Sequence, residues 1–318
     1  MRPLRNCGGL FLSETEGETL DILIWLLISI IIFFIWVIVF DTSRFTVSSY
    51  EFESDKVRKD VRVVFLSDLH CKMYGEGGTF LLEKIRELSP QLVLIGGDMI
   101  TAHPGKGTEK VENFLKELYK SFPMVYAYGN HELRLKLYPE TYGDAWETYT
   151  KSLSDAGITI TENGVFSLEE TGINVISFSA DRSYYKRMKE TTMDPSYIEE
   201  TVGKPDPAAY NILLAHNPVY AETYAAYGAD MTLSGHLHGG LVRLPLPVSK
   251  EAREKGAHVM RGLFSPKLSL FPKYDAGRFD INGRSVIISR GLGSHSIPIR
   301  VFNPGELVVI DLKPTGGV

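Results

Sequence analysis

Five short motifs along the chain contain the residue types that bind divalent metal ions. Carboxylate oxygens, imidazole nitrogens and an amide oxygen suit Mn, Fe or Zn, whereas softer metals prefer thiolates. Five of the eight histidines fall inside the motifs, which a core-packing role does not explain. The motifs are, in chain order, Asp68-Leu69-His70, Gly96-Gly97-Asp98, Gly129-Asn130-His131, His216-Asn217-Pro218 and Gly235-His236-Leu237-His238.

Each motif comes directly after an apolar run that reads as a β-strand. Residues 61–66, 92–95 and 124–128 precede the first three motifs, and residues 212–215 and 231–233 precede the last two. Helix-like segments separate the runs, which predicts an α/β fold with parallel strands joined by right-handed crossovers. Because parallel strands end at the same edge of a sheet, we expect the motif side chains to converge there.

Local signals predict several helix starts and one hairpin. The side chains placed to cap a helix are Thr108, Asp194 and Asn217, the last two before a proline at the first helical position. Asn282-Gly283 predicts a type I′ turn between two short strands. Residues 307–312 predict a closing strand.

Taken together, the motifs resemble those of the calcineurin-like metallophosphoesterase superfamily, in which D-x-H, G-D, G-N-H, H and G-H-x-H follow one another. The match runs here from residue 68 to residue 238. Ser289 to Gly293, followed by Pro298 to Arg300, is similar to the closing signature of the bacterial membrane-anchored branch, which includes UDP-2,3-diacylglucosamine hydrolases. The resemblance implies a four-layer α/β/β/α metallophosphoesterase sandwich. It also implies hydrolysis of a phosphoester or pyrophosphate bond with two metal ions.

The resemblance further implies a role for each motif residue. Asp98 would bridge two divalent ions, and the two glycines before it would let the backbone and the metal approach closely. A water between ions about 3.5–4 Å apart would become the attacking hydroxide. His131 would bind no metal but would protonate the leaving oxygen, so Asp98 and His131 are the expected catalytic residues. One ion would be held by Asp68, His70 and His238 with Asp98, and the other by Asn130, His216 and His236 with Asp98.

Residues 20–40 are apolar and carry no charge after Asp21, which predicts one transmembrane helix. The run is too long for the apolar region of a signal peptide, and a soluble surface helix would keep a polar face. We therefore expect a polar tail at 1–19, a membrane span at 20–40, a juxtamembrane linker at 41–57 and a catalytic domain at 58–318.

Charges near the span predict on which side of the cytoplasmic membrane the domain lies. The short tail carries Arg2 and Arg5 and should stay in the cytoplasm, while a long following domain translocates largely regardless of its charge. Arg44 lies closer to the span and favours the opposite orientation. We expect an extracytoplasmic domain.

Composition and charge limit the classes of binding partner that we expect. A net charge of -5 offers no basic surface for a phosphate backbone, so nucleic acid is not an expected partner. Residues 243–278 hold eight Lys or Arg against three acids. These cations could contact anionic lipid head groups, at about 1 kcal/mol each, although a solvated loop is the simpler interpretation.

The sequence thus predicts a single-pass membrane enzyme with two divalent ions. Its substrate would contain phosphate and could be lipid-linked, such as UDP-2,3-diacylglucosamine or a related envelope lipid, with membrane lipids as further partners. Two alternatives are a protein phosphatase and a non-catalytic membrane-anchored module that retains the fold. The second has no reason to keep Asp98, Asn130 and His131 together.

Overall fold

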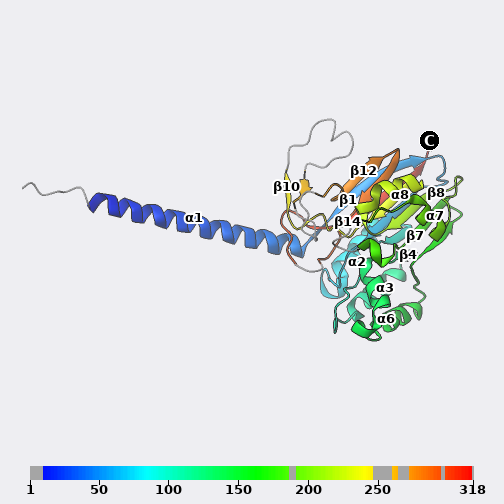
Figure 1. The fold of residues 1–318 in the computed structure, drawn as a ribbon, viewed down its shortest axis with the longest axis horizontal. Helices are drawn as coiled ribbons and strands as arrows, with labels where there is room; N and C mark the ends of the chain where they lie inside the picture. The colour runs from blue at the N-terminus through cyan, green and yellow to red at the C-terminus, as the bar shows by residue number, and fades with distance from the viewer. Residues whose placement is uncertain (1–9, 186–190, 246–259, 264–271, 295–297, 317–318) are drawn as a thin grey trace, which may run out of the picture.

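The computed structural model describes residues 10–185, 191–245, 260–263, 272–294 and 298–316 (Figure 1). Most of its strands belong to two six-stranded sheets. The first has the strand order β1-β14-β2-β3-β4-β5, and the second has the order β12-β13-β9-β8-β7-β6. A separate two-stranded sheet pairs β10 (Arg243–Pro245) with β11 (Met260–Gly262).

Both sheets have a parallel centre. In the first, β2 to β5 are parallel, and β14 pairs antiparallel with β2 and parallel with β1. In the second, β7, β8, β9 and β13 are parallel, with β6 and β12 antiparallel at the edges. The first sheet comprises β1 Phe45–Ser54, β2 Val61–Leu66, β3 Leu92–Ile95, β4 Met124–Ala127, β5 Ile160–Thr161 and β14 Gly305–Pro314. The second comprises β6 Gly164–Leu168, β7 Ile173–Phe178, β8 Tyr210–Ala215, β9 Met231–Ser234, β12 Gly277–Ile281 and β13 Arg284–Ile288.

The two sheets pack face to face around an apolar core. Successive side chains of a strand point to opposite faces, so alternate residues enter this core. Val63 and Phe65 of β2 lie in it with Leu94 of β3, and they meet Leu214 and Leu233 of the second sheet. All five side chains are buried, so the strands before the motifs are held in a rigid double layer.

Helices cover the outer faces of the sheets. Val64 and Leu66, the remaining alternate residues of β2, lie in one cluster with Ile85 of α2 and Leu115 of α3. Helices α7 and α8 contact the second sheet, and Figure 1 shows them on the opposite side from α2, α3 and α6. The layer order is therefore α/β/β/α, as predicted. These helices are α2 Thr79–Leu88, α3 Glu109–Tyr119, α4 Asn130–Leu137, α5 Pro139–Tyr142, α6 Ala145–Ser154, α7 Pro195–Val202 and α8 Ala221–Tyr227.

Helix α1 (Leu10–Ser43) projects away from the sheets (Figure 1). Within the described residues, its part from Glu18 to Ser43 is the one helix long and apolar enough to cross a membrane. Its side chains from residue 20 to residue 36 are exposed on every side, which a soluble helix would avoid. Length and composition thus agree with the predicted span.

The structure corrects the linker predicted at residues 41–57. Strand β1 occupies Phe45–Ser54 and pairs with β14 along its whole length, from Phe45 opposite Gly305 to Ser54 opposite Pro314. The sequence hid this strand because its apolar residues keep no single alternation: the pattern shifts by one residue at Ser48-Ser49.

Most local predictions are confirmed, with two differences. Asp194 caps α7 by accepting a hydrogen bond from Ser196 N, and Asn282-Gly283 closes the β12–β13 hairpin with positive φ at both residues. Asn217 caps a short 3₁₀ helix, Pro218–Tyr220, that leads into α8. Thr108 precedes α3 but caps no backbone group, because its hydroxyl donates to Glu112 instead.

Part of the basic stretch at 243–278, residues 246–259 and 264–271, lies outside the described residues. Three of its described cations pair with acids of the same domain. The pairs are Arg243–Asp275, Lys273–Glu222 and Arg278–Asp280. Lys273 and Arg278 reach solvent and fit the simpler interpretation of a solvated loop, whereas Arg243 is buried with Asp275 and belongs to the interior of the domain.

Candidate active site

The motif residues converge where the parallel strands of both sheets end. Strands β2, β3 and β4 of the first sheet lead into the first three motifs, and β8 and β9 of the second sheet lead into the last two. Seven of the predicted site residues are buried and His236 is half-buried; the buried ones are Asp68, His70, Asp98, Asn130, His131, His216 and His238.

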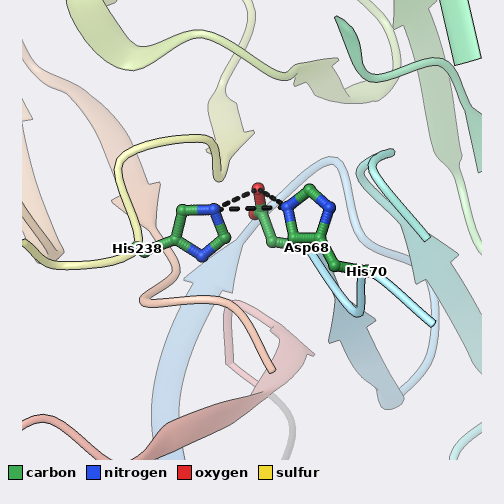
Figure 2. A group of neighbouring side chains, drawn as sticks. All are labelled: Asp68, His70 and His238. Carbon is green, nitrogen blue, oxygen red and sulfur yellow. Dashed lines mark hydrogen bonds and ion pairs between the residues drawn. The ribbon is translucent and has the colours of Figure 1, made fainter. Parts of the chain in front are cut away.

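Three groups of side chains bring their ligand atoms within 4.8 Å of one another. In the first, His238 Nε2 lies 3.5 Å from Asp68 Oδ1 and 3.3 Å from His70 Nε2 (Figure 2). The second and third groups share Asp98. The groups are Asp68, His70 and His238; Asp98, His216 and His236; and His70, Asp98 and His131.

Asp98 lies between the histidines of the first two groups. Its Oδ2 atom is 3.1 Å from His216 Nε2 and 3.8 Å from His70 Nε2. Its Oδ1 atom accepts a hydrogen bond from His131 N at 2.8 Å, which fixes the carboxylate plane. One oxygen is therefore held by the backbone while the other faces both groups, as a bridging ligand requires.

The site fits divalent cations by two further observations. The buried ligand atom Asn130 Oδ1 makes no hydrogen bond among the described residues, and the buried His216 Nε2 has ion-pair contacts with the carboxylates of Asp98 and Asp68. Burial lowers the pKa of His216, but the carboxylates of Asp98 and Asp68 outweigh burial and raise it to about 10. The negative charge thus attracts a proton onto a buried imidazole. A divalent cation would balance the same negative charge and would bind both Asn130 Oδ1 and His216 Nε2.

Hydrogen bonds on the far side of the rings fix the ligand histidines. His216 Nδ1 lies 2.7 Å from the carbonyl oxygen of Gly96, and His238 Nδ1 lies 3.1 Å from that of Gly293. A carbonyl only accepts, so each Nδ1 carries a proton. With a cation in place of the proton on His216, each Nε2 turns its lone pair toward the site, the arrangement found in metal-binding histidines.

His131 has the opposite arrangement. The backbone N–H of Ala102 donates to His131 Nδ1 at 2.7 Å, so the proton of the neutral ring is on Nε2. That atom lies 4.0 Å from Asp98 Oδ2. His131 thus presents a proton to the site. The hydrogen bond from Ala102 N argues against His131 as a metal ligand, although its ring lies close to Asp98.

Glu132 is a site residue that the sequence analysis missed. Its carboxylate is fully buried and accepts hydrogen bonds at 2.8–2.9 Å from Asp98 N, Met99 N, Gly129 N and the hydroxyl of Tyr126. Burial, followed by the charge of Asp98, raises the pKa of Glu132 to about 7. The signal was its place at the third position of α4, where a carboxylate can bond the residue before the helix.

The backbone of the site adopts an uncommon conformation. Five proposed ligands have φ between 51° and 69°, a left-handed region that costs about 1–2 kcal/mol for a residue other than glycine. Such residues cluster at functional sites, where surrounding bonds hold them. They are Asp68, His70, Asp98, His236 and His238.

Glycines allow two ligand loops to touch. A Cβ at Gly97 would lie 2.1 Å from Gly129 N, and a Cβ at Gly129 would lie 2.2 Å from Asp98 Oδ1. Both distances are far below van der Waals contact, so only glycine fits. The close approach at Gly97 is thus between two ligand loops.

The closing signature, Ser289 to Gly293 with Pro298 to Arg300, supports the site from the side away from the ligand atoms. Arg300 is fully buried, and burial lowers its pKa to about 10. Its guanidinium donates to the carbonyl oxygens of Arg290, Gly291 and Gly293, and the last of these also bonds His238 Nδ1. Within the described residues, these contacts give Arg300 a structural role, which is to hold the loop behind His238.

Comparisons with known proteins agree with this geometry. The sequence model of calcineurin-like phosphoesterases matches residues 61–240. The chain is 26% identical to Bacillus subtilis YpbG over 81% of this chain and 83% of that protein. It is 24% identical to LpxG of Chlamydia muridarum, a UDP-2,3-diacylglucosamine pyrophosphatase, over 79% of this chain and 83% of that protein.

Two further matches differ more in length or sequence. A metallophosphoesterase of Helicobacter pylori is 27% identical over 82% of this chain, which spans 62% of that protein. A dimetal phosphatase from Danio rerio has a TM-score of 0.40 and 12% identity, covering 74% of this chain and 88% of that one.

Proposed function

The chain belongs to the calcineurin-like phosphoesterase family, and we propose that it is a membrane-anchored hydrolase of phosphodiester or pyrophosphate bonds in a lipid-linked substrate. Metal-dependent hydrolysis of a phosphoester bond is the activity of the family. UDP-2,3-diacylglucosamine or a related envelope lipid is the proposed substrate. The likeness to LpxG and the apolar helix α1 support this choice.

The position of Asp98 is the observation that carries the proposal. Asp98 Oδ2 faces both His70 and His216, which suits a carboxylate shared by two cations. One cation would also be bound by Asp68, His70 and His238. The other would also be bound by Asn130, His216 and His236. The nitrogen and oxygen donors suit Mn, Fe and Zn alike.

Two bound cations would neutralise the phosphoryl oxygens and make a water acidic enough to attack phosphorus at neutral pH. The protein's own residues orient the reaction around them. Asn130 offers a neutral oxygen, so it adds no negative charge where the phosphate binds.

His131 supplies the proton for the leaving group. As the bond from phosphorus to the leaving oxygen breaks, its electron pair takes the proton of His131 Nε2. The water oxygen forms the new bond to phosphorus, and the proton that the water releases returns to Nε2, so that the ring ends neutral. Ala102 N holds His131 Nδ1, so the ring is fixed in the tautomer that carries its proton on Nε2.

The test uses the full chain in detergent micelles, loaded separately with Mn²⁺, Fe²⁺ and Zn²⁺. The substrates are an aryl monoester, an aryl diester, a phosphopeptide and UDP-2,3-diacylglucosamine. We expect cleavage of the diester and of the nucleotide-linked lipid, and Asp98→Asn should abolish it together with binding of both cations. Turnover of the phosphopeptide alone would make the protein a phosphatase of proteins. Failure to cleave any substrate with both ions bound would favour the non-catalytic module.

A further inference from the structure

A single residue, Arg44, connects α1 to the catalytic domain. Helix α1 ends at Ser43, and β1 begins at Phe45. The carbonyl oxygen of Arg44 accepts a hydrogen bond from Gly305 N at 3.2 Å, the first contact of the long pairing between β1 and β14. The helix therefore joins the domain at a fixed place rather than through a tether (Figure 1).

The last two turns of α1 are packed against the domain, unlike the rest of the helix. Val37 and Asp41 are 4% and 3% exposed. A buried carboxylate is stable only with partners. Asp41 Oδ2 accepts a hydrogen bond from Asn303 N at 3.1 Å, and Asp41 Oδ1 pairs with Arg44 at 2.8 Å.

Asn303 continues this contact to a proposed metal ligand. Its side chain is fully buried, and Nδ2 donates to the carbonyl oxygens of His238 and Gly240 at 2.8 and 2.6 Å. The segment that it holds has positive φ at His236, His238, Gly239 and Gly240. A strained segment of this kind persists only when outside contacts fix it. Asn303 is one such contact, and Asp41 fixes Asn303.

A second contact reaches the other histidine of the same metal group. Lys72 follows His70 by two residues, and its ammonium group donates to the carbonyl oxygen of Thr42 in the last turn of α1. It also donates to the hydroxyl of Tyr74 at 3.1 Å. The segments of His70 and His238, which meet in Figure 2, are thus both bonded to this turn.

The link is uneven between the two ions. His236, a proposed ligand of the other ion, lies on the segment that Asn303 holds, but the bonds from Asn303 Nδ2 go to the carbonyl oxygens of His238 and Gly240. Among the described residues, no hydrogen bond joins the last turn of α1 to Asn130 or His216, which belong to the other proposed ion. These two residues are held by the segments of α4 and β8 instead.

We propose that the last turn of α1 positions one half of the metal site, with Asp41 and Asn303 as positioning residues for His238. Releasing the turn weakens binding of the cation held by Asp68, His70 and His238. Binding of the cation held by Asn130, His216 and His236 is retained. The inference rests on the proposed ligand assignment and not on the identity of the substrate.

The test is Asp41→Ala in the full chain in detergent micelles, titrated with Mn²⁺ and followed by metal content and by electron paramagnetic resonance. Loss of an outer partner typically lowers metal affinity by about 10–100-fold, and we expect about tenfold for one equivalent. The second equivalent should change by less than about twofold. The spin-coupled signal of a Mn²⁺ pair should give way to that of isolated Mn²⁺ at substoichiometric loading.

Three further variants separate positioning from charge and from folding. Asp41→Asn keeps an oxygen for Asn303 N and should bind both equivalents. Arg44→Gln removes the ion pair but leaves that hydrogen bond, so it should also bind both. Asn303→Ala removes the donors to His238 and should reproduce the selective loss.

Two results would overturn the inference. The first is wild-type affinity for both equivalents in Asp41→Ala and Asn303→Ala. The second is an equal loss of both equivalents, which would mean that the turn stabilises the fold as a whole. An Asp98→Asn protein that retains a spin-coupled pair would count against the proposed metal site itself, which is a separate failure.

Discussion

His131 and His216 present opposite states of the same ring to the site. Ala102 N donates to Nδ1 of His131, whereas Nδ1 of His216 donates to the carbonyl oxygen of Gly96. The first ring therefore brings a proton and the second a lone pair. At the scale of single residues, we propose that backbone groups behind the rings decide which histidine binds metal and which transfers a proton.

His131→Ala should keep both cations and lose about 10²–10⁴ in rate, because only proton transfer to the leaving group is removed. The loss should be smallest for an activated aryl diester, whose leaving oxygen needs no proton. Rates on aryl and alkyl diesters, with metal content measured on the same samples, check this. His103→Ala is the control, since His103 is exposed and belongs to none of the three metal groups. A uniform loss for all leaving groups, or an empty metal site, would contradict the role.

Glu132→Gln should weaken the site without touching a ligand. The amide replaces one acceptor oxygen with a donor that faces Asp98 N, Met99 N or Gly129 N, so a buried N–H loses its partner. Such a loss costs about 1–3 kcal/mol in the free energy of unfolding. We expect that decrease in denaturant unfolding and a lower Mn²⁺ affinity. Unchanged stability and affinity would show that the carboxylate is dispensable.

At the scale of elements, the site depends on two loops that touch through glycine. Gly129→Ala places a Cβ 2.2 Å from Asp98 Oδ1 and must displace either the carboxylate or α4. We expect loss of the shared Asp98 ligand and hence of both cations. Gly107→Ala is the control, because it has no atom within 4 Å of its Cβ. Metal content of the two purified variants gives the comparison, and normal loading of Gly129→Ala would contradict this account.

The layer between the sheets should respond as a well-packed core. Leu94 of β3 is fully buried against the second sheet. Leu94→Ala should reduce the free energy of unfolding by about 2–5 kcal/mol. Phe80→Ala, at a 64% exposed side chain of α2, should change it by less than about 0.5 kcal/mol. Denaturant titration of the two variants measures the difference, and equal effects would mean that this layer is loosely packed.

The strands that carry ligands were predictable because their signals are local. Apolar runs at residues 61–66 and 92–95 became β2 and β3 with the same bounds. The contacts behind the site were not predictable, since they join distant parts of the chain. Asp41 and Asn303 are 262 positions apart, and no local sequence pattern around either residue indicates contact with the other. Left-handed backbone at Asp68 and Asp98 is likewise set by packing rather than by residue type.

At the scale of the whole molecule, α1 sets which compartment the site would face. Arg2 and Arg5 favour a cytoplasmic tail and an outward domain, so protease added to wall-stripped cells should degrade the domain without lysis. A cytosolic protein that stays intact in the same cells is the control. Protection of the domain until the membrane is broken would reverse the orientation, and the substrate would then be a lipid precursor on the cytosolic side.

The position of β14 has a consequence for the order in which the protein forms. This strand is the last of the chain, yet it lies between β1 and β2, the first two. During synthesis, α1 can enter a membrane while the place beside β2 is still empty. The ribosome must finish residue 314 before β1 gains its neighbour. We therefore expect β1, and with it the contact between α1 and the domain, to be the last part of the sheet to form. The proposed anchor would then be in place before the proposed metal site is complete.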